Sequence, residues 1–415
     1  MITFVHTADI HFGMENYGKI DPETGIHTRL LDFKRALDAC IDTAIARDVD
    51  FFLFSGDAYK TAAPSPTQQR LLLRCFLRLY QAKIPVIIVV GNHDNPLSFG
   101  KATSLDLFGE LPIDGFHVMA KPTSLRLNTK NGPVQIVGIP WPSRTTITIG
   151  KQHLLKSAPE ITDYISQAVS RIIREYAAAL DPAIPAVLAG HLTVSSGIFS
   201  GSEKRAIYGT DPLFLPSQLA LPPFDYVGLG HLHRYQNLNE GGYPAVVYSG
   251  SIERIDFGER KEDKGFCIVT IKEKNITEHE FIRVDARPFI QIEVMLNEHQ
   301  PQTEQILAEL ERHEITDAVV KILYHLPAGV TDKVSIHAIQ KACESAMYLV
   351  SIVPIRQFEV RERRTGLQVN QNPLTLLDSF FESHNEYKER KATLLDKTRL
   401  LMEEIATACH DEEQG

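Results

Sequence analysis

The sequence predicts a layered α/β fold. Its first half alternates short apolar runs with longer helical patterns, as happens when helices connect the strands of a sheet. The apolar runs are continuous, which indicates strands with both faces buried. With 415 residues, the chain is long enough for two or three domains and a sizeable core. The predicted core strands cover residues 51–54, 86–90, 134–137 and 186–189.

Helices are predicted over 28–47 and 66–82, the second beginning after Pro64-Ser65-Pro66. Around residues 272–288 a polar stretch and the Arg287-Pro288 step end the first domain. After residue 373 we expect a helical tail made of two short amphipathic helices. Between these points lies a small α/β domain, with strands predicted over 289–296, 318–326 and 348–355 and helices over 303–313 and 332–345.

The composition excludes several classes of protein. The formal net charge is −9, so the chain as a whole does not attract nucleic acid electrostatically. To bind a polyanion, the protein would need bound cations, a local basic groove or a partner subunit that supplies positive charge. No run approaches the roughly 18 apolar residues of a membrane span, and the N-terminus shows no export signal, so we expect a cytoplasmic protein without membrane association. The five cysteines form no CxxC pair, which argues against a disulfide framework and a structural zinc site.

Potential metal ligands follow five predicted strands, each after a small or turn-forming residue. In open α/β sheets ligands bind beyond the strand ends, so we expect one composite site. The pairs Asp9-x-His11 and His231-x-His233 can each aim two side chains at one point, because alternate residues of an extended segment point the same way. The candidate metal ligands are Asp9, His11, Asp57, Asn92, His191, His231 and His233.

This donor set predicts two metal ions. Seven oxygen and nitrogen donors are more than one ion accepts while keeping positions open for a substrate, so two ions would share a carboxylate. A set without thiolates suits Mn²⁺, Fe²⁺ or Zn²⁺. Two such ions can clamp a phosphoryl group and activate a water, so the predicted reaction is phosphoester hydrolysis. His93 is predicted to stabilise the developing charge or protonate the leaving oxygen, and Asp94 to orient it.

In this order, the motifs resemble the five-part signature of the calcineurin-like metallophosphoesterases. The resemblance implies a four-layer fold, in which a β-sandwich is flanked by helices. It also implies that Asp57 bridges two metals and that His93 is the catalytic histidine. The other ligands would form two sets, one of Asp9, His11 and His233 and the other of Asn92, His191 and His231.

Within this superfamily, the chain resembles the SbcD-type nuclease subunits, the bacterial counterparts of the double-strand-break repair nuclease. The stretch from Tyr248 to Glu259, followed by Lys264-Gly265-Phe266, resembles the segment that closes their phosphoesterase domain. The resemblance implies four parts, namely a nuclease domain over 1–280, a DNA-contacting cap domain over 281–358, a linker over 359–372 and a helical tail over 373–415 that docks on an ATPase partner.

The resemblance further implies a DNA endonuclease and 3′-to-5′ exonuclease that acts in DNA repair, recombination and replication. Its cofactors would be two Mn²⁺ ions, with Mg²⁺, Fe²⁺ or Zn²⁺ as alternatives. Its partners would be DNA and an SbcC-like coiled-coil ATPase, and it would dimerise through the nuclease domain. From the residues themselves, Arg254, Arg260 and Lys261 are candidate phosphate contacts near a metal cleft, although a solvated surface explains them equally well.

Two other interpretations of the sequence stay open. An enzyme acting on a small phosphodiester, such as a cyclic nucleotide, would use the same metals but would need neither a cap domain nor a docking tail. A non-catalytic scaffold with this fold would bind without hydrolysing. Scaffolds of that kind usually lose ligands, whereas every ligand position is filled here.

Overall fold

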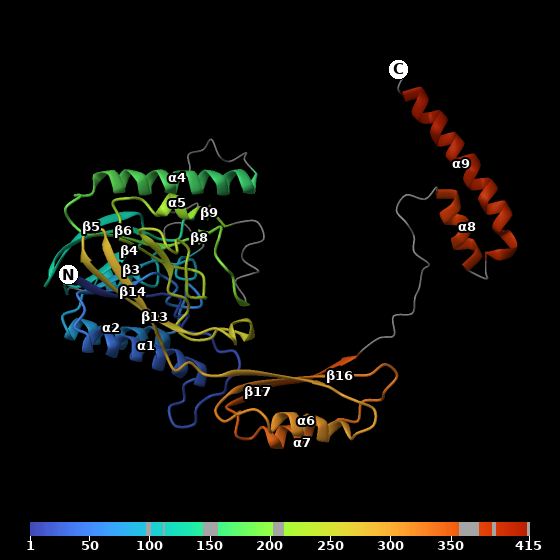
Figure 1. Ribbon diagram of the computed structural model, residues 1–415, viewed down its shortest axis with the longest axis horizontal. Helices are drawn as coiled ribbons and strands as arrows, with labels where there is room; N and C mark the ends of the chain where they lie inside the picture. Colours follow the sequence, from blue (N-terminus) through green and yellow to red (C-terminus); the bar gives the residue numbers. More distant parts are fainter. Residues whose placement is uncertain are drawn as a thin grey trace. The chain divides into compact units, whose positions relative to one another are not determined.

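The computed structural model describes residues 1–96, 101–110, 113–143, 157–201, 211–356, 373–383 and 387–412. Its main body contains two six-stranded sheets (Figure 1). The first has the order β14-β13-β1-β2-β3-β4, with β1 to β4 parallel and β13 antiparallel to β1. The second has the order β11-β12-β10-β7-β6-β5, with a parallel centre and an antiparallel strand at each edge.

The strands of the first sheet are β1 (Ile2–Thr7), β2 (Phe51–Phe54), β3 (Val86–Val89), β4 (Phe116–Met119), β13 (Gly265–Glu273) and β14 (Ile276–Arg283). Those of the second are β5 (Thr123–Thr129), β6 (Gly132–Ile139), β7 (Ala186–His191), β10 (Tyr226–Gly230), β11 (Gln236–Asn237) and β12 (Ala245–Tyr248). A short parallel pair is formed by β8 (Thr193–Val194) and β9 (Leu213–Phe214). The helices of this body are α1 (Thr28–Ala46), α2 (Pro66–Gln81), α3 (Asp106–Gly109), α4 (Ala158–Ala179) and α5 (Pro216–Leu219), with a 3-10 turn at Phe257–Glu259.

Three apolar cores hold the layers together. Helices α1 and α2 pack on the outer face of the first sheet, where Phe33 and Phe52 belong to one apolar core. Helix α4 packs on the outer face of the second, where Ile173 and Leu188 belong to another (Figure 1). The inner faces of the two sheets pack against each other through residues such as Phe51 of the first and Val187 of the second. The order helix, sheet, sheet, helix confirms the predicted layered α/β fold.

Capping interactions explain where two helices begin. The Ser65 hydroxyl accepts from the Gln68 N–H, and the Gln68 side chain accepts from the Ser65 N–H, which places the first residue of α2 at Pro66 as predicted. Ser157 and Glu160 form the same motif at the start of α4, a helix that the sequence analysis does not predict.

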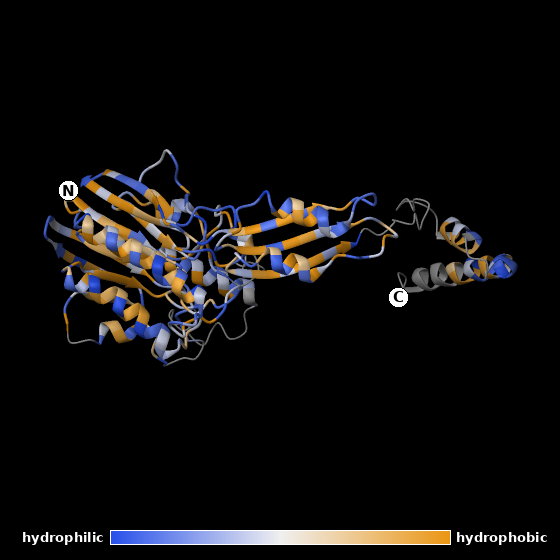
Figure 2. Ribbon diagram, turned by 90° about the horizontal axis from the view of Figure 1, so that it is seen from below, coloured by the Kyte–Doolittle hydropathy of each residue, from blue (hydrophilic) through white to orange (hydrophobic). Residues whose placement is uncertain are grey.

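A three-stranded sheet with the order β15-β16-β17 follows the first two sheets. Its elements are β15 (Phe289–Met295), α6 (Gln302–Leu310), β16 (Val319–Leu326), α7 (Ile336–Ala342) and β17 (Tyr348–Arg356). It has its own apolar core, and Figure 2 shows hydrophobic residues concentrated along the strands of the sheets. Helix α7 is shorter than the predicted 332–345, because Asp332 bonds to the Tyr324 hydroxyl and the Val334 N–H and Ser335 then caps the helix.

A second compact unit comprises residues from 356 onward. It contains α8 (Pro373–Ser383) and α9 (Lys391–Glu412), so two helices are present as predicted, the second longer than expected. The predicted linker over 359–372 lies outside the described residues. Across the described part of the chain, none of the helices combines the length and the apolar character that crossing a bilayer requires.

His6 is a titratable group buried between the two large sheets, and we predict that it makes the protein sensitive to acid. Its Nδ1 lies 3.0 Å from the Tyr226 hydroxyl, and burial lowers the pKa of His6 to about 3. The unfolded chain therefore binds a proton that the folded chain does not, so stability is lost as pH falls from about 6.5 towards 3. Between roughly pH 7 and pH 4, the free energy of unfolding of wild type should fall by about 3 kcal/mol more than that of His6→Gln, which lacks this titratable group.

Urea unfolding of both proteins at the two pH values measures this difference. His299→Gln is the matched control, because His299 is exposed and its loss should leave the pH dependence unchanged. Equal pH dependence in wild type and His6→Gln would contradict the prediction.

Candidate metal centre

The seven predicted ligands meet where strands of both large sheets end. Asp9 and His11 follow β1, Asp57 follows β2 and Asn92 follows β3, all in the first sheet. From the second sheet, His191 is the last residue of β7, and His231 and His233 follow β10. Six of the seven side chains are buried, with exposed fractions of 6% or less, while Asn92 is half-buried. The two sheets thus contribute to one site, as the strand-end pattern predicts.

Asp57 lies between two groups of donors. Its Oδ2 is 3.6 Å from His11 Nε2 on one side and 3.4 Å from His191 Nε2 on the other. On the first side, His11 Nε2 is 3.1 Å from His233 Nε2 and 4.0 Å from an oxygen of Asp9. On the second side, Asn92 Oδ1 is 2.9 Å from His191 Nε2 and 3.2 Å from His231 Nδ1. Asp57 thus lies between the two groups, while Asp9 has a ligand atom within 4.8 Å of both the His11–His233 pair and the Asp57–His191 pair, so the division into two ligand sets stays a prediction.

The backbone is strained where it presents these ligands. Among the described residues, nine non-glycine residues have a positive φ, and four of them are candidate ligands: Asp9, His11, Asp57 and His231. Such conformations cost roughly 1–3 kcal/mol each and cluster at functional sites. A Cβ at Gly91 would lie 2.1 Å from Asp57 Oδ1, so the glycine before Asn92 is needed for the close approach of these two loops.

Hydrogen bonds on the outer side fix two of the histidine rings. The Nδ1–H of His191 donates to the Ser55 carbonyl at 2.7 Å, and the Nδ1–H of His233 donates to Glu259 at 2.8 Å. In the neutral rings these partners place the proton on Nδ1 and direct both Nε2 lone pairs into the cluster, where Asn92 Oδ1 and other acceptors lie. Lone pairs that converge in this way are stabilised by a cation, and such outer bonds are typical of metal-ligating histidines. The residues therefore fit a pair of divalent cations.

The electrostatics of the cluster also favour positive charge. Burial opposes ionisation of Asp57, but the imidazoles of His191, His93 and His11 outweigh it and hold the pKa of Asp57 well below its usual range. Burial likewise opposes protonation of His191, yet Asp57 raises the pKa of His191 to about 9. Burial raises the pKa of Asp9 to about 7. A site that stabilises a buried imidazolium beside a shared carboxylate can exchange that proton for a metal ion.

Comparison with known proteins identifies the family. A family model described as calcineurin-like phosphoesterase matches residues 2–235, which include all seven candidate ligands. The chain belongs to the calcineurin-like phosphoesterase family. The predicted resemblance to SbcD-type proteins is confirmed as well, because the chain is 27% identical over 323 residues to a Staphylococcus saprophyticus protein named as the SbcD component of the SbcCD nuclease, covering 78% of this chain and 79% of that one.

Two solved structures also match this phosphoesterase. A dimetal phosphatase from Danio rerio has 11% identity and a TM-score of 0.38, covering 68% of this chain and 98% of the other. A Thermus thermophilus protein has 14% identity and a TM-score of 0.37, covering 68% of this chain and 99% of the other.

In this phosphoesterase, His93 lies beside the ligand cluster on its exposed side. Its ring centroid is 4.9 Å from that of His11, in an edge-on arrangement. Its Nδ1 is 2.8 Å from the Lys60 carbonyl, and its backbone N–H donates to Asp57. The hydrogen bond assigns the proton to Nδ1 and leaves Nε2 available to a substrate.

Asp94 does not orient His93 as the sequence analysis expects. Its two carboxylate oxygens accept from four backbone N–H groups, those of Asp57, Ala58, Tyr59 and Gly91. Asp94 is fully buried, and these bonds hold together the two loops that carry Asp57 and Asn92. The residue that orients His93 is Lys60, through its main-chain carbonyl, and Asp94 is a positioning residue for the ligand loops.

The three predicted phosphate contacts differ in what they touch. Both Nη atoms of Arg254 donate to main-chain carbonyls, those of Ala286, Arg287 and Glu262, and its Nε is buried. These hydrogen bonds hold in place the segment that leads into the third sheet. Arg254 therefore has a structural role in place of the predicted phosphate contact. The Arg260 guanidinium donates to the Phe257 carbonyl, and Lys261 is exposed. A phosphate contact by Arg260 or Lys261 stays a prediction.

Several residues of the site were missed by the sequence analysis. Glu259 is fully buried and bonds both His233 and the ammonium of Lys264. Asp211 places an oxygen 3.7 Å from His231 Nε2, and the Trp141 ring lies 4.9 Å from the His231 ring. Only Glu259 had a signal in the sequence, since it ends the stretch that resembles the closing segment of the family.

Proposed function

We propose that this phosphoesterase is a two-metal-dependent DNA nuclease, an endonuclease and 3′-to-5′ exonuclease that hydrolyses phosphodiester bonds. Its cofactors are two Mn²⁺ ions in this proposal, held by Asp9, His11, Asp57 and His233 on one side and by Asp57, Asn92, His191 and His231 on the other. The observation that carries the proposal is the position of the Asp57 carboxylate, within 3.6 Å and 3.4 Å of histidines from the two donor groups.

The side chains around the ligands have separate tasks in this reaction. Two divalent cations bound there would polarise a phosphoryl group and supply an activated water. To act as the acid, His93 must carry a second proton on Nε2, which it gives to the leaving oxygen, while its Nδ1–H stays on the Lys60 carbonyl and keeps the ring in place. Asp94 holds the two ligand loops together, and Glu259 keeps His233 in the required orientation.

The similarity to a component of an SbcCD nuclease supports DNA as the substrate and an SbcC-like coiled-coil ATPase as the partner. In this proposal residues 1–280 cut DNA, residues 281–358 contact it, and the tail at 373–415 docks on the ATPase. The protein forms a homodimer through its nuclease domain and acts in the cytoplasm, in DNA repair, recombination and replication.

His93→Ala should lower the rate of cutting by about 10²- to 10³-fold, because a positioned acid contributes at least that much. The assay follows a labelled DNA duplex with purified protein and Mn²⁺, and a chelator should stop the wild-type reaction. Bound metal, measured in the same samples, should be unchanged in the variant.

The matched control is His117→Ala, a half-buried histidine of β4 that makes no contact with the ligands among the described residues. Normal cutting by His93→Ala would remove His93 from the mechanism.

A chromogenic diester and a cyclic nucleotide in the same assay separate the two alternative functions. An enzyme for small phosphodiesters would hydrolyse these substrates and leave DNA intact. A non-catalytic scaffold would hydrolyse none of them, even with metal bound.

A further inference from the structure

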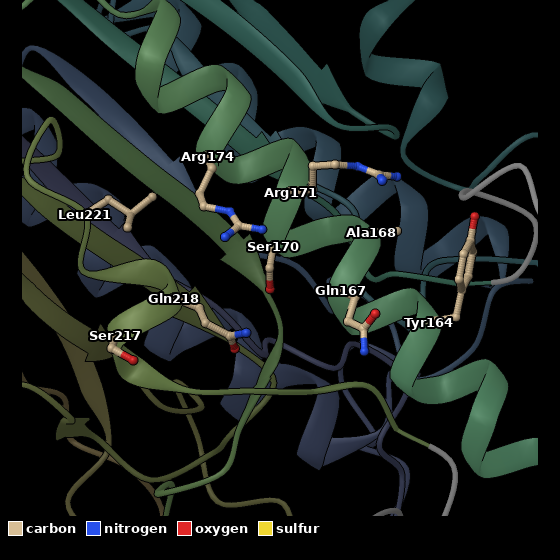
Figure 3. A pocket seen from close by; sticks show the side chains of 9 residues that line it. All are labelled: Tyr164, Gln167, Ala168, Ser170, Arg171, Arg174, Ser217, Gln218 and Leu221. Carbon is tan, nitrogen blue, oxygen red and sulfur yellow. The ribbon is translucent and has the colours of Figure 1, made fainter.

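A pocket lined by none of the candidate metal ligands lies between α4 and α5 (Figure 3). Its volume is about 550 Å³, within the range of small-molecule sites. The pocket is lined by Tyr164, Gln167, Ala168, Ser170, Arg171, Arg174, Ser217, Gln218 and Leu221. These residues include two arginines and no acidic side chain, although the chain as a whole carries a net charge of −9. The charged side chains that line the pocket are thus basic, on a chain that is acidic as a whole.

Ser170 is the observation that points to a ligand. Its side chain is only 5% exposed, and its hydroxyl oxygen has no hydrogen-bond partner among the described residues. A buried hydroxyl without a partner is destabilising, so native proteins rarely keep one. In Figure 3 this oxygen points from α4 towards the side of the pocket where Gln218 lies. A bound acceptor in the pocket would satisfy it.

Arg174 supplies the positive charge next to this hydroxyl. It forms no hydrogen bond or ion pair with any residue that the structure describes, and Figure 3 shows its guanidinium extended towards Ser170. Arg171, in contrast, points the other way and lies 4.0 Å from Glu175. A guanidinium beside a hydroxyl provides several N–H and O–H donors close together, and the oxygens of one phosphate group can accept hydrogen bonds from all of them.

The opposite wall completes the site. Gln218 uses its side-chain oxygen to accept from the Leu215 N–H, which turns its Nε2 into a donor for the pocket. Leu221 and Ala168 add apolar surface, so the pocket can hold more than a bare phosphate ion. Its volume and its mixture of donors and apolar side chains suit a phosphate ester with an organic group attached.

We propose that this pocket binds the phosphate group of a nucleotide, with Arg174 and Ser170 as its main contacts. The choice of a nucleotide rests on the proposed function, because a nuclease releases nucleoside monophosphates and holds DNA strands. The phosphate therefore has two sources, a free mononucleotide or the backbone of a single strand, and the experiment distinguishes them.

The test measures binding to the full chain by titration calorimetry, in a chelator so that no metal is present. The probes are deoxyadenosine 5′-monophosphate, deoxyadenosine and a short single-stranded oligothymidylate. We expect the monophosphate to bind and the nucleoside to bind at least about 10-fold more weakly, since the nucleoside lacks the charged group that the Arg174 guanidinium would bind. If the oligonucleotide alone binds through this pocket, the source is the strand backbone.

Three variants assign the binding to the pocket. Arg174→Ala should weaken binding of the active probe about 10-fold or more, and Ser170→Ala should weaken it several-fold without loss of thermal stability, because it removes an unsatisfied hydroxyl. The control is Arg74→Ala, an exposed arginine of α2 without a partner among the described residues.

Equal binding by Arg174→Ala and Arg74→Ala, or no binding of either phosphate probe at millimolar concentration, would overturn the proposal and leave Arg174 a solvated surface residue. Neither result depends on metal or on cutting. The nuclease assay with Mn²⁺ therefore tests the proposed function separately.

Discussion

Asp57→Asn should reduce phosphodiester hydrolysis by about 10⁴-fold or more and lower the amount of bound metal. The Asp57 carboxylate lies between histidines of the two donor groups, 3.6 Å from His11 and 3.4 Å from His191. Removing its charge weakens both sites together, and the loss of several kcal/mol of charge stabilisation corresponds to that change in rate.

This substitution isolates the charge from the backbone. Asp57 has a φ of +58°, a conformation that Asn tolerates well, so the turn should be preserved. The Asn oxygen can also still accept the N–H of His93. Circular dichroism and urea unfolding of the metal-free proteins should therefore be similar for wild type and variant, while metal content and cutting rate differ.

Asp48→Asn is a close control. Asp48 has a φ of +46°, and its carboxylate lies 2.5 Å from Lys130 in an exposed ion pair, away from the ligands. It should keep normal activity. If Asp57→Asn bound two metals per chain and cut DNA at the rate of Asp48→Asn, Asp57 would not be the bridging ligand.

The clustering of the candidate ligands could be predicted from the sequence because their signal is local. Each lies within a few residues of a strand end, and a motif such as Asp9-x-His11 fixes the relative direction of its side chains without knowledge of the rest of the fold. The topology then brings the strand ends together, because parallel strands end at the same edge of a sheet. Layered α/β packing was predictable for the same reason, from continuous apolar runs such as 86–90.

What could not be predicted depends on contacts between distant segments. Asp94 follows His93 in the sequence, which suggested that the two side chains interact, but the turn directs the Asp94 carboxylate to main-chain N–H groups of the loop after β2. Arg254 was predicted to be a surface cation, yet its guanidinium donates a hydrogen bond to the main-chain carbonyl of Ala286, which lies 32 residues later in the sequence. No local sequence pattern distinguishes a basic residue that binds phosphate from one that donates hydrogen bonds to main-chain carbonyls.

The buried ion pair of Glu259 and Lys264 links the closing segment to the metal centre. Lys264 is 2% exposed, and its ammonium lies 2.7 Å from Glu259 and donates to the His233 carbonyl at 3.0 Å. Burial opposes ionisation of Glu259, but Lys264 and His233 outweigh it and hold the pKa of Glu259 below its usual range. Lys264 is thus the main group that compensates the charge of the Glu259 carboxylate, which in turn orients His233.

Lys264→Met should destabilise the protein by about 3–5 kcal/mol, because it leaves the buried Glu259 charge without its partner while the apolar side chain fills the space. Urea unfolding measures this change. The variant should also need about 10- to 100-fold more metal for half-maximal activity, since Lys264 no longer holds the Glu259 carboxylate and the His233 carbonyl in place. Lys272→Met is the control, because Lys272 pairs with Glu278 on the surface and its loss should cost less than about 1 kcal/mol.

The double variant Lys264→Met/Glu259→Gln distinguishes charge from packing. Glutamine can still accept the His233 Nδ1–H, and it carries no charge that needs compensation, so the double variant should be more stable than Lys264→Met alone. If Lys264→Met instead matched Lys272→Met in stability, the carboxylate of Glu259 would not depend on Lys264. If the double variant were less stable than Lys264→Met, the cost would lie in packing and not in the unpaired charge.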